Sequence, residues 1–149
     1  MKKVVVIKVG GAILENEESL CRLLDDFAAL PGNKVLVHGG GRAATRIAAG
    51  LGIESQMING RRVTDEKMLD IVTMVYGGLV NKHAVAGLQS RGVNALGLTG
   101  ADMNVIQGHK RPVKDVDYGW VGDVDCADGY ALKTLLEQGL YKHSVKYKQ

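Results

Sequence analysis

Residues 35–41, Val35-Leu36-Val37-His38-Gly39-Gly40-Gly41, run from a short apolar stretch directly into three consecutive glycines. A continuous aliphatic run of this kind is typical of a strand buried on both faces of a parallel sheet. Residues 4–11 repeat the arrangement, because Val4-Val5-Val6-Ile7 is followed by Lys8-Val9-Gly10-Gly11. Helical spacing follows each glycine segment. The order strand–helix–strand–helix predicts an α/β fold with an open, mostly parallel sheet.

The same alternation continues along the chain as one domain without repeats. Apolar spacing predicts helices over 17–30, 44–51, 65–91 and 132–136, and the apolar run over 95–98 predicts a third buried strand. In the long helix, Thr64 is the expected cap and Leu79 is expected on the buried face. Its Gly77-Gly78 pair predicts a kink or a close helix contact. Upstream, Asn59-Gly60 predicts a tight hairpin turn.

Composition excludes several classes of protein. The chain has 149 residues and 20 glycines, and the glycines are neither periodic nor accompanied by proline, which excludes collagen. The formal net charge of +3 equals the three lysines of residues 139–149, so the rest of the chain is balanced and nucleic-acid binding is disfavoured. No stretch has the length of a signal peptide or a membrane span, and Cys21 and Cys126 have no metal-ligand spacing. We therefore expect a cytoplasmic protein without a metal site or membrane contact.

The two glycine segments are the strongest candidates for a ligand site. Both follow strands, and ligands of open α/β sheets bind at the carboxyl ends of the strands. Glycine lets a ligand approach the backbone, although Gly10-Gly11 alone could serve a tight turn. Lys8 lies at the same edge, either as a solvated strand end or as a point charge beside a phosphate. The Arg61-Arg62 pair includes a candidate for holding a carboxylate through two parallel hydrogen bonds.

Several motifs, in order along the chain, resemble the amino acid kinase family, and within it the acylglutamate kinases. Besides the two glycine segments, the resemblance rests on a third motif, Asn59-Gly60-Arg61-Arg62-Val63-Thr64. Its Asn-Gly-x-Arg-Val-Thr pattern is specific to that branch. Three further motifs agree with it: Val80-Asn81-Lys82, Gly97-Leu98-Thr99-Gly100-Ala101-Asp102 and Gly119-Trp120-Val121-Gly122-Asp123-Val124. The resemblance runs from about residue 3 to residue 139. It implies an α-β-α sandwich of the amino acid kinase type.

The resemblance also implies an activity and a set of site residues. The activity is phosphorylation of the γ-carboxylate of N-acetyl-L-glutamate by ATP with Mg²⁺, the second step of arginine biosynthesis. Lys8 would then stabilise the transferring phosphoryl group, and Arg62 would bind the α-carboxylate of the substrate. Phosphate would contact the backbone N–H groups of Gly10, Gly11, Gly40 and Gly41. Gly40 and Gly41 would also contact the substrate. The chain would form a homodimer through the helix over 65–91.

The resemblance ends near residue 139. Residues 1–139 resemble the N-terminal, substrate-binding domain of the family, whereas residues 140–149 form a basic tail that matches nothing and is too charged for a buried central strand. We therefore expect a chain truncated before the nucleotide-binding half and inactive alone. Two alternatives stay open: an N-succinylglutamate kinase, which would need another base near the site, and a non-catalytic module for acylglutamate binding or dimerisation.

Overall fold

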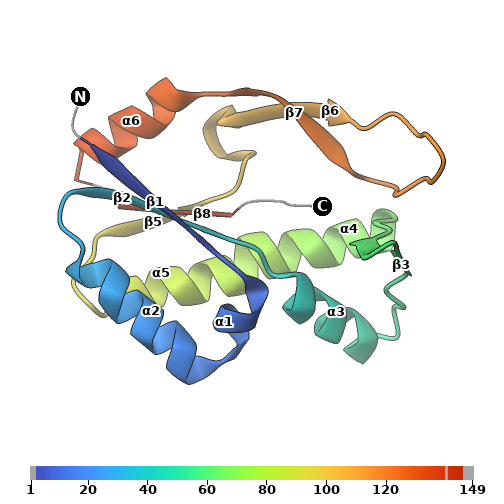
Figure 1. Ribbon diagram of the computed structural model, residues 1–149, viewed down its shortest axis with the longest axis horizontal. Helices are drawn as coiled ribbons and strands as arrows, with labels where there is room; N and C mark the ends of the chain where they lie inside the picture. Colours follow the sequence, from blue (N-terminus) through green and yellow to red (C-terminus); the bar gives the residue numbers. More distant parts are fainter. Residues whose placement is uncertain (1–2, 140, 146–149) are drawn as a thin grey trace.

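The fold is built on a parallel sheet with helices packed against it (Figure 1). The computed structural model describes residues 3–139 and 141–145. Neighbouring strands pair in the order β1-β2-β8-β5, and all three pairings are parallel. The strands of this sheet are β1 (Val4–Val9), β2 (Asn33–His38), β5 (Ala95–Leu98) and β8 (Tyr141–Val145). The expected α/β class with a parallel sheet is confirmed.

The helices form a layer on one side of the sheet, and α6 and a β-hairpin lie on the other side (Figure 1). The helical layer contains α1 (Gly11–Glu15), α2 (Glu17–Ala29), α3 (Gly41–Gly50), α4 (Glu66–Thr73), the π-helix η1 (Met74–Val80) and α5 (Asn81–Gln89). The opposite side contains β6 (Ile106–Lys110), β7 (Gly122–Ala127) and α6 (Gly129–Glu137). Two short elements complete the fold, the hairpin β3 (Met57–Ile58) with β4 (Arg61–Arg62) and the 3₁₀ turn η2 (Asp102–Asn104). No described helix has both the length and the apolar character needed to cross a membrane.

Strand β8 differs from the sequence-based expectation. The segment after Gly139 was expected to be too charged for a central strand, and this is wrong for the backbone of Tyr141–Val145. That backbone pairs with β2 on one side and with β5 on the other. The ladder uses backbone N–H and C=O groups, which every residue other than proline supplies, and residues 141–145 contain no proline. Residues 140 and 146–149 of the expected tail lie outside the described residues.

The long helix is interrupted by the π-helical segment η1, which contains the Gly77-Gly78 pair. A π-helix has more residues per turn than an α-helix, so it rotates the residues that follow. Leu79 is 39% exposed, and the expectation that it lies on the buried face is therefore wrong. Asn81, two positions later, is 1% exposed and faces the interior instead. The helix is also capped one residue later than expected, because the carboxylate of Asp65 accepts from the N–H of Met68 at 2.8 Å.

Burial along β1 is one-sided. The expectation from Val4-Val5-Val6-Ile7 was a strand covered on both faces, but Val6 is 63% exposed while Val9 is buried. The side chains of a strand alternate between its two faces, so the helical layer covers the odd-numbered residues only. The apolar core on the helical side includes Phe27 and Leu36, both nearly inaccessible to solvent.

Lys34 is a buried cation that closes the end of helix α2. Its side chain is only slightly exposed, and its ammonium donates to the carbonyl oxygens of Ala28 at 2.9 Å and Leu30 at 2.7 Å. Burial lowers the pKa of this ammonium group. The last carbonyl groups of a helix lack partners within the helix, and a lysine at that position satisfies them. Lys34 thus fixes the connection from α2 into β2.

Candidate active site

The two glycine segments lie side by side at one edge of the sheet. Strands β1 and β2 pair in parallel with Val9 opposite His38, so Gly10 and Gly39 both follow at the same level. Helix α1 begins at Gly11 and helix α3 begins at Gly41. The segments therefore meet as expected from the rule that sites of open α/β sheets form at the carboxyl ends of the strands.

Arg62 is brought to this edge by the predicted hairpin. Asn59 and Gly60 both have positive φ angles, 50° and 73°, which is the backbone of a type I′ turn. Arg62 Nη2 then donates to the carbonyl oxygen of Gly41 and to Thr45 Oγ1, each at 2.6 Å. The Nε–H of Arg62 is buried and has no hydrogen-bond partner among the described residues. The guanidinium thus keeps one N–H that no described group accepts.

Two cavities flank the glycine segments. The first, here called the Arg62 pocket, has a volume of about 470 Å³ and is lined by the hairpin, by Gly41 and by Tyr76. The second, here called the Gly11 pocket, has a volume of about 360 Å³ and is lined by Gly11, Gly40, Arg46 and His83 among others. Both volumes are of the size that small-molecule sites have.

The expected site residues divide between these cavities. Gly41 and Arg62 line the Arg62 pocket, and Gly11 and Gly40 line the Gly11 pocket. Lys8 and Gly10 line neither. Lys8 is an exposed residue of β1 and pairs in register with Val37, three residues before Gly40. The edge of the sheet therefore presents a lysine, glycine backbone and an arginine.

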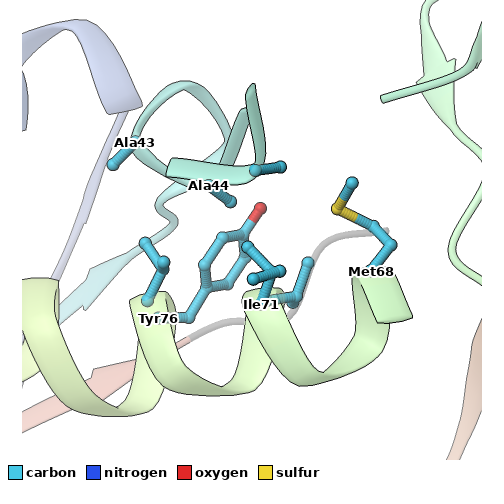
Figure 2. Close-up of a cluster of buried hydrophobic side chains, with 8 residues drawn as sticks. Ala43, Ala44, Met68, Ile71 and Tyr76 are labelled. Carbon is cyan, nitrogen blue, oxygen red and sulfur yellow. The ribbon is translucent and has the colours of Figure 1, made fainter. Parts of the chain in front are cut away.

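Tyr76 and Thr45 were missed by the sequence analysis. Tyr76 comes from the π-helical segment and lines the Arg62 pocket, and Figure 2 shows its ring rising from the helix toward helix α3. Thr45 lies one helical turn after Gly41, and its hydroxyl donates to the carbonyl oxygen of Gly41 at 3.0 Å. The spacing of Thr45 from the glycines could have indicated its position. Nothing in the sequence distinguishes Tyr76 from an ordinary core aromatic.

Burial and hydrogen bonds shift the pKa of two titratable groups near this edge. Burial lowers the pKa of His38, although its ring contacts the carbonyl oxygen of Gly39 at 2.8 Å, which raises it. This buried position directly before the glycines suits a structural role for His38. The pKa of Asp102 is lowered by hydrogen bonds from the N–H and the hydroxyl of Thr99. Asp102 therefore stabilises the turn that follows β5.

A second segment, around Gly119, is attached to the wall of the Arg62 pocket at Thr64. The N–H of Thr64 donates to the carbonyl oxygen of Tyr118 at 2.8 Å, and the N–H of Trp120 donates to the carbonyl oxygen of Thr64 at 2.7 Å. Gly119 has a φ of 75°, and a Cβ there would overlap the carbonyl oxygen of Thr64. Only glycine fits this bridge without strain.

Gly119→Ala is therefore expected to lower the free energy of unfolding by about 2–3 kcal/mol. Positive φ accounts for only part of the cost, and the overlap with Thr64 adds the rest. Gly32→Ala is the matched control, because Gly32 has a φ of 78° and open space around its Cβ position. Urea denaturation followed by circular dichroism should give about 1 kcal/mol for Gly32→Ala. Equal losses for the two variants would contradict the importance of the bridge.

The family and the relatives that this chain matches agree with one another. Residues 3–141 match the amino acid kinase family. Acetylglutamate kinase of Bacteroides thetaiotaomicron is 68% identical over 139 residues, which are 93% of this chain and 54% of the relative. Acetylglutamate kinase of Parabacteroides distasonis is 65% identical over 94% of this chain and 55% of the relative. The chain thus spans about half the length of the curated relatives it matches.

Solved structures give the same fold. A protein of Streptococcus mutans UA159 superposes with a TM-score of 0.80 at 25% identity, covering 97% of this chain and 59% of the other. N-acetylglutamate synthase from Neisseria gonorrhoeae, solved with coenzyme A and N-acetyl-glutamate, superposes with a TM-score of 0.76 at 26% identity. That match covers 95% of this chain and 33% of the synthase.

Proposed function

Because the chain belongs to the amino acid kinase family, we propose that it forms the acceptor-binding part of a kinase that phosphorylates the γ-carboxylate of N-acetyl-L-glutamate with ATP. The curated relatives named acetylglutamate kinase support this substrate. The observation that carries the proposal is the guanidinium of Arg62. It lines a cavity, it is held against the Gly41 backbone, and its Nε–H is buried without a hydrogen-bond partner among the described residues.

The geometry suggests how the substrate is oriented. N-acetyl-L-glutamate has two carboxylates, and only the γ-carboxylate reacts. With the α-carboxylate on Arg62, the γ-carboxylate would extend toward the glycine segments at the edge of the sheet. Hydrogen bonds from a guanidinium to a carboxylate are stronger than those between neutral groups, so Arg62 is suited to set this orientation.

In the proposed reaction, an oxygen of the γ-carboxylate attacks the γ-phosphorus of ATP. A new oxygen–phosphorus bond forms, the bond from that phosphorus to the β,γ-bridging oxygen breaks, and ADP leaves with that electron pair. No protein nucleophile is required. Lys8 and the N–H groups of Gly10, Gly11, Gly40 and Gly41 would stabilise negative charge on the transferring group, which is the main requirement of phosphoryl transfer.

Mg²⁺ accompanies ATP in the expectation drawn from the family. Within residues 3–139 and 141–145, no three His, Cys, Asp or Glu side chains form a group that could hold a metal ion. The described residues thus contain no all-protein cage for the ion, and Mg²⁺ is usually held by one or two carboxylates together with the phosphates of the nucleotide.

Titration calorimetry with N-acetyl-L-glutamate tests the acceptor site, and L-glutamate is the matched ligand without the acyl group. We expect saturable binding of N-acetyl-L-glutamate and binding of L-glutamate at least about tenfold weaker, because free glutamate brings a charged ammonium where the substrate has a neutral amide. Equal affinities, or no heat with either ligand, would contradict the proposal. Hydroxylamine added with ATP traps any acyl phosphate as a hydroxamate and measures phosphoryl transfer.

One observation favours the second candidate, N-succinyl-L-glutamate. Arg61 also lines the Arg62 pocket, and in the described part of the chain its side chain has no hydrogen-bond or ion-pair partner. N-succinyl-L-glutamate carries a third carboxylate that N-acetyl-L-glutamate lacks, and Arg61 is the additional base that this carboxylate would need. Calorimetry with both acids distinguishes them. Arg61→Ala should weaken binding of the succinyl compound alone if that compound is the substrate.

A homodimer through the helix over 65–91 is also part of the proposed function. Met74 is 56% exposed and Leu79 is 39% exposed, so this helix presents two large apolar side chains to solvent. We expect sedimentation equilibrium to give a dimer for the unsubstituted chain and a monomer for Met74→Glu, since a charge is costly in an apolar interface. Lys67→Glu, at an exposed position of α4, is the control for the change of charge. A monomeric unsubstituted chain would contradict the dimer.

A further inference from the structure

The ring of Tyr76 packs directly on the backbone of Gly40. A Cβ built on Gly40 would lie 2.8 Å from Tyr76 Cδ1, 3.1 Å from Cε1 and 3.4 Å from Cγ, and these are its three nearest neighbours. Carbon atoms in contact are normally separated by about 3.5–4.0 Å. The ring therefore occupies the space that any side chain at position 40 would need.

The ring is fixed in this place by its surroundings. Tyr76 is 7% exposed, and it belongs to a buried cluster formed by helices α3 and α4 and the π-helical segment, with Ala43, Ala44 and Val75 among its members (Figure 2). Protein interiors are close-packed, so the ring has little room to move away. A side chain added at position 40 would displace the glycine segment instead of the ring.

Tyr76 lies in the wall between the two cavities. It lines the Arg62 pocket, whereas Gly40, which it contacts, lines the Gly11 pocket. A Cβ on Gly41 would lie 3.4 Å from the hydroxyl oxygen of Tyr76 and 3.9 Å from Arg62 Nη2. The tyrosine ring, the backbone of Gly40-Gly41 and the guanidinium of Arg62 thus form one packed unit at the wall of the Arg62 pocket.

We propose that Tyr76 is a positioning residue, which holds the Gly40-Gly41 backbone in place for acylglutamate binding in the Arg62 pocket. Glycine is required at position 40 because of this ring. The sequence alone suggested instead that this glycine makes room for a ligand. The proposal rests on the proposed function for the identity of the ligand, whereas the packing of the ring on Gly40 is independent of it.

A double-mutant cycle between positions 40 and 76 tests the proposal. Gly40→Ala is expected to raise the Kd for N-acetyl-L-glutamate by about tenfold or more and to lower Tm by several degrees. With Tyr76→Ala present, the added methyl group has space, and Gly40→Ala should change Kd by less than about threefold. If Tyr76→Ala does not fold, Tyr76→Leu serves in its place, because its side chain is smaller and flexible.

Three controls complete the experiment. Gly39→Ala should have little effect, because a Cβ at position 39 has no neighbour within 4 Å. Val75→Ala removes volume from the same core cluster, and it should lower Tm without changing how Gly40→Ala affects Kd. Tyr76→Phe keeps the ring, so it should retain binding within about threefold and full sensitivity to Gly40→Ala.

The outcomes separate the proposal from the proposed function. A loss of binding from Gly40→Ala that is the same with and without Tyr76 would overturn the proposal and show that the ligand itself requires the glycine. If the unsubstituted chain does not bind N-acetyl-L-glutamate, the proposed function fails. The cycle in Tm then decides the packing claim alone, and additive changes in Tm would overturn it.

Discussion

Replacing Arg62 with alanine is expected to weaken binding of N-acetyl-L-glutamate by about 100-fold, which corresponds to about 3 kcal/mol. The guanidinium lines the pocket, is fixed by the Gly41 carbonyl oxygen and Thr45 Oγ1, and has an Nε–H without a hydrogen-bond partner among the described residues. Arg62→Lys should recover little of the loss, since an ammonium lacks the planar, rigid geometry with which the guanidinium is held against the Gly41 carbonyl oxygen and Thr45 Oγ1. Calorimetry measures both changes.

Two controls show whether the loss comes from the guanidinium or from general damage to the pocket. Arg61→Ala removes the neighbouring exposed arginine of the same pocket and should change the Kd for N-acetyl-L-glutamate by less than about threefold. Thr45→Ala removes one partner of Arg62 while keeping the guanidinium, and it should have an effect between the two. A loss below about fivefold for Arg62→Ala would contradict its assignment to the α-carboxylate.

Gly97→Ala is expected to cause the largest loss of stability, about 3–4 kcal/mol in the free energy of unfolding. Gly97 lies in β5, and helix α5 crosses closely above it. A Cβ there would overlap Asn81 Oδ1 and would lie 2.8 Å from both Asn81 Cγ and Val85 Cγ2. Asn81 is 1% exposed, so it cannot move aside without disturbing the core.

Gly78→Ala is the matched control for Gly97→Ala. Gly78 lies in the π-helical segment, and a Cβ there would have no neighbour within 4 Å. Urea denaturation should show a change of less than about 1 kcal/mol, because alanine favours helices more than glycine does. A similar small change for Gly97→Ala would mean that helix α5 and strand β5 separate easily.

Local sequence patterns were sufficient for the framework of the fold. Aliphatic runs followed by glycine predicted β1 and β2, and Asn59-Gly60 predicted the hairpin that carries Arg62, because a type I′ turn requires two residues that tolerate positive φ. These features depend on a few neighbouring residues. The proximity of the two glycine segments followed from the parallel order of the strands alone.

Features that depend on distant contacts could not be predicted in this way. The π-helical segment rotates Leu79 outward and Asn81 inward, and no local periodicity indicates one additional residue in a helical turn. Strand β8 is placed by pairing with β2 and β5, whereas its composition argued against a central position. The role of Tyr76 follows from its contact with Gly40, 36 positions earlier in the sequence.

A residue-by-residue NMR titration of the chain with N-acetyl-L-glutamate tests most directly whether the Arg62 pocket is the acceptor site. The backbone amide signals of Gly41, Gly60, Arg62 and Tyr76 should shift together and saturate at one Kd, and Arg62→Ala should abolish these shifts. Signals of Leu14 and His83, which line the Gly11 pocket away from the hairpin, should change far less. Saturable shifts confined to the Gly11 pocket, or no saturable shifts at all, would contradict an acceptor site at Arg62.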